Sequence, residues 1–164
     1  MRAPAEVVPY DERWPDWFDQ IQVVLEGLLD GLSYEIEHVG STAVPGLAAK
    51  PIIDIDVVVP SPDEVPAAVA ALVSGGYEHQ GDLGIAGREA FGLPAEVARY
   101  HHLYVVVDGN KAHRDHVMLR DRLRVDPEAL ARYAALKREL APLLLTDRSA
   151  YVDGKSALIG ELLR

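Results

Sequence analysis

The segment IIDIDVVV, from Ile52 to Val59, constrains the fold more than any other part of the chain. Its branched side chains predict a β-strand, in which alternate residues point to opposite faces. Asp54 and Asp56 therefore share one face, with backbones about 7 Å apart. Burying an unpaired carboxylate costs several kcal/mol. This strand therefore needs a solvated end, a cationic partner such as Lys50, or a divalent cation between its aspartates. Mg²⁺ suits the last arrangement, because it binds carboxylate oxygens and completes its shell with water and phosphates.

Apolar spacing and turn residues predict the other elements. Strands are expected at about 34–39, 52–59, 77–80, 85–91 and 100–107. Helices are expected at about 14–30, from Ser61 to about 75, from about His113, from Asp126-Pro127, and at about 149–163. Because strands and helices intermix, the fold class is α/β or α+β, with one mixed sheet and a helical C-terminal third. We expect a single domain over residues 1–164.

Composition excludes several classes of function. Sixteen Lys and Arg against 26 Asp and Glu give a net charge of −10, which disfavours nucleic acid as a partner. The chain has no cysteine, which rules out disulfides, thiolate metal sites and a cysteine nucleophile. No signal peptide or membrane-spanning run is recognisable, so we expect a cytoplasmic protein with no membrane partner. The sequence favours no particular oligomeric state.

The loop before this strand has the composition of a phosphate site. Gly40 allows close backbone approach to a ligand, and Ser41 and Thr42 offer hydroxyl groups. The order of a P-loop is missing, and a lone Gly-Ser is common in turns. Gly-Ser followed at short range by a strand with D-x-D is a much stronger signal.

Gly40-Ser41 followed by Asp54-x-Asp56 resembles the signature of the polymerase β type nucleotidyltransferase superfamily. The segment HVGSTAVPGLAAKPIIDI, from His38 to Ile55, resembles its GrpB branch, and further matches extend to Tyr151 and Lys155. The resemblance implies a nucleotidyltransferase-like mixed sheet flanked by helices. It also implies that Gly40 and Ser41 bind phosphates and that Asp54 and Asp56 are catalytic ligands of Mg²⁺ or Mn²⁺.

One departure from the superfamily pattern concerns the third carboxylate, which many active members carry on a later strand. The strand at 100–107 has no acid before Asp108, and His102 and Tyr104 share a face instead. His102 is therefore a candidate catalytic base, because histidine titrates near neutral pH. Asp108 is read as a turn residue.

Several basic residues are candidates for phosphate or acceptor binding. Lys50 precedes the aspartate strand, Arg88 follows a predicted turn, and Lys155 lies in the last helix. His113 and His116 share a helical face, but the charged residues between them favour an exposed helix over a metal site.

These observations favour a metal-dependent enzyme that transfers a nucleotidyl group from a nucleoside triphosphate to a small-molecule or protein acceptor. The alternative is a non-catalytic nucleotide- or metabolite-binding module, which the missing third acid favours. GrpB-like domains also occur fused to dephospho-coenzyme A kinase, which links this alternative to coenzyme A metabolism.

Overall fold

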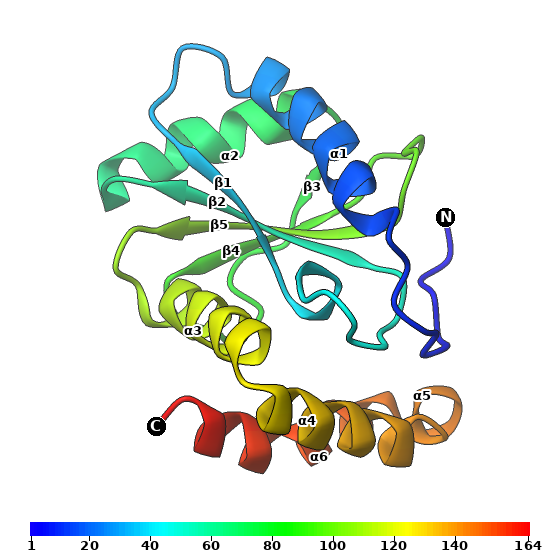
Figure 1. Ribbon diagram of the computed structural model, residues 1–164. Helices are drawn as coiled ribbons and strands as arrows, with labels where there is room; N and C mark the ends of the chain where they lie inside the picture. The colour runs from blue at the N-terminus through cyan, green and yellow to red at the C-terminus, as the bar shows by residue number, and fades with distance from the viewer.

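The computed structural model describes all 164 residues and contains one five-stranded mixed sheet with helices on both faces (Figure 1). The strands are β1 Glu35–Val39, β2 Ile53–Val59, β3 Glu78–His79, β4 Arg88–Gly92 and β5 His101–Val107. The helices are α1 Trp14–Leu28, α2 Val65–Ser74, α3 Lys111–Val125, α4 Pro127–Leu140, α5 Leu143–Thr146 and α6 Arg148–Leu162. The predicted fold class is confirmed.

The strand order β1-β2-β5-β4-β3 gives the aspartate strand a neighbour on each side. β2 pairs antiparallel with β1 and parallel with β5, while β4 and β3 continue the sheet in antiparallel pairs. The β2–β5 register sets Asp54 beside His102 and Asp56 beside Tyr104. Residues about 50 positions apart in the chain thus become side-by-side neighbours.

The two faces of β2 are covered by different helices. Ile53, Ile55 and Val57 belong to the main apolar core, which α1 and α2 complete on one face (Figure 1). The opposite face, which carries Asp54 and Asp56, is covered by α3. Branched residues on both faces of β2 are what a buried central strand requires.

The C-terminal helices pack against one another and against the loop between β1 and β2. Val44 and Leu47 of this loop form a second apolar cluster with Leu123 and Tyr133, and Leu162 joins them from α6. The last third of the chain is thereby fixed beside the Gly-Ser segment and the end of the aspartate strand.

Most element boundaries differ little from the predicted ones. The strand predicted at 85–91 begins at Arg88, because a turn closed by the Ile85 N–H on the Asp82 carbonyl precedes it. The helix predicted from His113 begins at Lys111, because the Asn110 side chain accepts a bond from the Ala112 N–H. The short helix α5 was not predicted. No helix has the length and apolar character needed to cross a membrane.

Candidate functional site

Asp54 and Asp56 lie on one face of β2 but in different surroundings. Asp54 is partly exposed, with 28% of its side-chain surface accessible, and its Oδ1 lies 2.8 Å from Nδ1 of His102. Asp56 has no accessible surface at all. One carboxylate thus opens to solvent while the other is sealed under α3.

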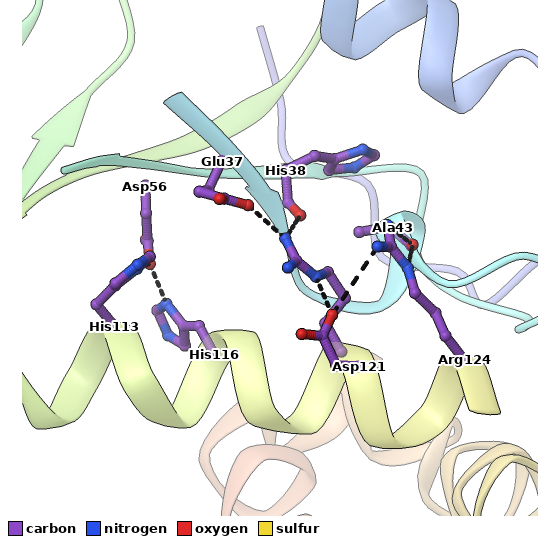
Figure 2. A network of polar contacts seen from close by, with 9 residues as sticks. Glu37, His38, Ala43, Asp56, His113, His116, Asp121 and Arg124 are labelled. Carbon is purple, nitrogen blue, oxygen red and sulfur yellow. Dashed lines mark hydrogen bonds and ion pairs between the residues drawn. The ribbon is translucent and has the colours of Figure 1, made fainter. Parts of the chain in front are cut away.

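Two histidines of α3 bind the buried Asp56. Nδ1 of His113 lies 2.9 Å, and Nδ1 of His116 2.8 Å, from Asp56 Oδ2 (Figure 2). Burial opposes the charged form of Asp56, but these hydrogen bonds outweigh it and lower the pKa of the carboxyl group. Burial also acts against a charged His116, yet the bond to Asp56 raises the pKa of this imidazole. The expectation that both histidines lie on an exposed helix face is wrong, because that face of α3 packs against the sheet.

The surroundings of the two carboxylates bear on whether they can hold a divalent cation. No three metal-binding side chains of the structure surround a common point that could hold an ion. Asp56 Oδ1, however, is buried without a hydrogen-bond partner, and Asp54 lies on the same face. Mg²⁺ commonly takes two protein carboxylates and completes its shell with water and substrate phosphates. The orphaned Oδ1 of Asp56, on the face that Asp54 shares, is the feature of this site that a divalent cation would satisfy.

The Gly-Ser loop touches the aspartate strand directly. Gly40 has φ 75° and ψ −173°, and a Cβ built there would lie 2.2 Å from Asp54 Oδ2. Only glycine adopts this conformation readily, and only glycine leaves room for the carboxylate. Thr42 is buried: its hydroxyl donates to the Ile52 carbonyl at 3.0 Å and contacts the His38 ring. The Thr42 hydroxyl does not reach the pocket of about 210 Å³ that Ser41 lines together with Lys50 and Asp54. The prediction that Thr42 binds phosphate is therefore not supported.

Replacing Gly40 by alanine is expected to lower the free energy of unfolding by about 1–3 kcal/mol, because of backbone strain and the clash with Asp54. Urea denaturation measures this loss. Gly27→Ala is the matched control, since Gly27 lies in α1 with open space around it. Alanine there should be neutral or stabilising by up to about 1 kcal/mol. Equal effects of the two changes would contradict the close approach of Gly40 to Asp54.

A strongly cationic pocket of about 210 Å³ opens between this loop, β2 and the C-terminal helices. Ser41, Asp54 and His102 lie in its wall. Its four cationic side chains come from the segment before β2, from α4 and from α6: Lys50, Lys137, Arg148 and Lys155. Four cations against one carboxylate, in a chain with net charge −10, favour an anionic ligand.

Burial and mutual repulsion perturb the lysines of this pocket. Lys137 is only 3% exposed, and burial together with nearby Lys155 lowers its pKa to about 7. Burial and nearby Lys50 lower the pKa of Lys155 to about 8. The Lys137 ammonium donates to the Ala48 carbonyl at 2.9 Å, and it has no carboxylate partner. An anion in the pocket would stabilise the charged forms of these amines.

Comparison with known proteins identifies the relatives of the chain. The model of the family described as GrpB protein matches residues 4–164. The chain belongs to the GrpB family. The UPF0157 protein YqkA of Bacillus subtilis is 35% identical over 158 residues, which cover 96% of this chain and 46% of YqkA. A dephospho-CoA kinase of Mycolicibacterium paratuberculosis is 30% identical over 94% of this chain and 44% of its own length. The GrpB chain thus spans about half the length of these curated relatives.

Solved structures support the same family and fold. The conserved protein GrpB from Enterococcus faecalis superposes with a TM-score of 0.82 at 31% identity, over 96% of this chain and 94% of that one. The Cid1 poly(U) polymerase superposes with a TM-score of 0.55 at 16% identity, over 84% of this chain and 43% of that one. This second likeness concerns the fold alone. The expected GrpB membership and nucleotidyltransferase-like fold are thereby confirmed.

In this GrpB chain the predicted candidates separate into two groups. Lys50 and Lys155 lie with Ser41, Asp54 and His102 around the cationic pocket. Gly40, Thr42, Asp56 and Arg88 do not line that pocket. Arg88 lies on β4, where its guanidinium group stands 4.5 Å from the centre of the Tyr104 ring of β5 and its Nε is buried without a partner.

Sequence reasoning missed Lys137 and Arg148 as members of the pocket. For Lys137 a signal existed, because it recurs with Tyr133 and Leu140 on the apolar stripe of α4. A lysine on an apolar stripe is either a long surface side chain or a buried charge that needs a partner. No comparable signal marked Arg148.

Proposed function

We propose that this GrpB-family chain binds a nucleoside triphosphate together with a divalent cation and transfers the nucleotidyl group to a small-molecule or protein acceptor. The observation that carries the proposal is the cationic pocket. Four basic side chains line this pocket together with Ser41 and the partly exposed carboxylate of Asp54. A triphosphate chain matches this charge, and the nucleotidyltransferase-like fold of the family supports it.

In this proposal different residues bind the polyphosphate and the cation. Lys50, Lys137, Arg148 and Lys155 bind the polyphosphate, and Ser41 donates to a phosphate oxygen. Asp54 and Asp56 hold the cation, which neutralises charge on the phosphate oxygens when bound. The preorganised cations stabilise negative charge that grows on the leaving pyrophosphate.

His102 is the base in the proposed transfer. Because its Nδ1 faces Asp54 Oδ1, the tautomer with a proton on Nδ1 leaves Nε2 free to accept one. Nε2 takes the proton of an acceptor hydroxyl, whose oxygen attacks the α-phosphorus. The bond between the α-phosphorus and the pyrophosphate oxygen then breaks, and pyrophosphate leaves.

The second candidate function is a nucleotide- or metabolite-binding module without catalysis. The observation in its favour is the pairing of Asp54 with His102 at the place where a third carboxylate is missing. The dephospho-CoA kinase among the relatives supports a link to coenzyme A metabolism for such a module.

Thermal unfolding tests the binding step. Each of the four nucleoside triphosphates, with Mg²⁺ or Mn²⁺, is added to the purified chain, and at least one is expected to raise the melting temperature. Asp54→Asn and Asp56→Asn should abolish the rise. Asp108→Asn is the matched control, because Asp108 is exposed just beyond the far end of β5. This variant should show the same rise in melting temperature as the wild type. A wild-type melting curve that no combination moves would refute nucleotide binding.

Transfer is tested separately from binding. A triphosphate labelled at the α-phosphate is incubated with metabolite and protein extracts, and label is expected to appear on an acceptor with release of pyrophosphate. His102→Gln should retain the thermal shift and lose the transfer. Binding by the wild type without any transfer would favour the module.

A further inference from the structure

Two arginines of α3 bind the carbonyl groups on either side of the Gly-Ser loop (Figure 2). Arg120 Nη1 donates to the His38 carbonyl at 3.0 Å, and also to Glu37 Oε2 at 2.6 Å. Arg124 donates to the Ala43 carbonyl from Nε at 2.9 Å and from Nη2 at 2.7 Å. One guanidinium group therefore anchors the chain just before Gly40, and the other anchors it just after Ser41-Thr42.

The environment of the Arg120 bonds makes them strong. Only 11% of the Arg120 side chain is accessible, and a charged donor in such a setting forms stronger bonds than a neutral one. Asp121 Oδ1 lies 2.8 Å from Arg120 Nε and 3.9 Å from Arg124 Nη1, between the two guanidinium groups. Arg120 is thus fixed in its orientation by Asp121, and Arg124 by its two bonds to the Ala43 carbonyl.

The same helix also holds the other half of the site. His113 and His116 bind Asp56 from the first half of α3, while Arg120 and Arg124 bind the loop from the second half. α3 therefore contacts both the loop and the aspartate strand, which the β1–β2 ladder also joins where Val39 pairs with Asp54. Neither arginine lines the cationic pocket, so their influence on a ligand there passes through the loop.

We propose that Arg120 and Arg124 are positioning residues that fix the Gly40–Ser41 loop for phosphate binding. This inference rests on the proposed function. A displacement of about 1 Å can cost as much as 100-fold in a reaction that depends on position, so loosening either anchor is expected to weaken the contacts of the loop with a phosphate. Lysine cannot replace Arg124, because a single ammonium group cannot reproduce the fork with which Arg124 binds the Ala43 carbonyl. At Arg120 lysine loses the separate Nε bond to Asp121 that orients the side chain.

The test uses the full chain with Arg120→Lys and Arg124→Lys together. Amide hydrogen exchange across residues 40–44 should become about tenfold faster, while exchange in β2 stays unchanged. The affinity for the magnesium complex of a non-hydrolysable triphosphate, measured by calorimetry, should fall by about tenfold or more. Arg122→Lys is the matched control, because Arg122 lies on the same helix, pairs with Asp126 at 2.9 Å and should change neither quantity.

Each outcome decides a different point. Wild-type affinity in the double variant, or unchanged exchange at 40–44, overturns the positioning role. If the wild type itself binds no triphosphate, the proposed function fails first and the inference with it. If the double variant does not fold, Arg124→Lys alone decides by the same two measurements, since this side chain is 40% exposed.

Discussion

Replacing Asp56 by alanine is expected to lower the free energy of unfolding by about 3 kcal/mol, because removing one partner of a buried ion pair leaves the other uncompensated. His113 and His116 would lose their only side-chain partner in the structure. Their rings would then face a cavity in place of a carboxylate. Urea denaturation at pH 7, analysed for the midpoint and slope, measures the loss.

Asp54→Ala is the control for this variant, since it removes the same group from the same face of the same strand. Asp54 is partly exposed and contacts one histidine, so the expected loss is at most about 1 kcal/mol. Both variants should lose metal-dependent triphosphate binding, but only Asp56→Ala should lose much stability. Equal stability losses would show that α3 does not depend on the buried carboxylate.

The Asp56–His116 pair also makes stability depend on pH in a defined way. The pKa of Asp56 lies below its usual value of 3.8, so its contribution is present above about pH 4 and is lost as acid protonates the folded state. The pKa of His116 lies above 6.5, so its contribution is present below that value and is lost as the pH rises through the folded-state pKa. Wild type and Asp56→Ala should therefore differ most between pH 4 and 6.5.

Much of this fold was predictable because local patterns determined it. Strand alternation alone put Asp54 and Asp56 on one face, and the spacing of Gly40-Ser41 before them indicated a joint site. Asp126 marked the start of α4, and Ser61 caps a 3₁₀ turn at Pro62–Glu64 that leads into α2. Strand alternation and helix capping depend on residues close in sequence, so they can be predicted without knowing how distant elements pack.

Other features of the site depend on how distant elements close together. His113 and His116 face Asp56 only because α3 crosses the sheet. The charged residues between them, Arg114 and Asp115, had predicted an exposed helix face instead. Arg88 was predicted in a loop after a turn, but it begins β4, and the strand order puts β5 between it and the aspartates. Sequence spacing cannot reveal which helix covers which face when the chain offers several.

Lys137→Met is expected to stabilise the fold by about 2 kcal/mol at pH 7, because methionine removes a buried charge whose pKa burial lowers to about 7. The lost hydrogen bond to the Ala48 carbonyl offsets part of the gain. The same variant should bind the magnesium complex of a triphosphate about 100-fold more weakly, since it lacks a desolvated cation that faces the phosphates. Urea denaturation and calorimetry measure the two opposite changes.

The pH dependence separates this explanation from a general packing effect. The unfolded chain keeps the Lys137 proton up to about pH 10.5, whereas the folded chain releases it near pH 7, so wild-type stability should rise between these values. Lys137→Met should lack this rise. Bound phosphates favour the charged amine, so wild-type affinity should fall above pH 7 as binding takes up a proton. Lys111→Met, at an exposed lysine of α3, should leave stability and affinity unchanged. If Lys137→Met is destabilised and still binds triphosphate, this lysine is structural. The triphosphate would then be bound by the other cationic side chains of the pocket, Lys50, Arg148 and Lys155.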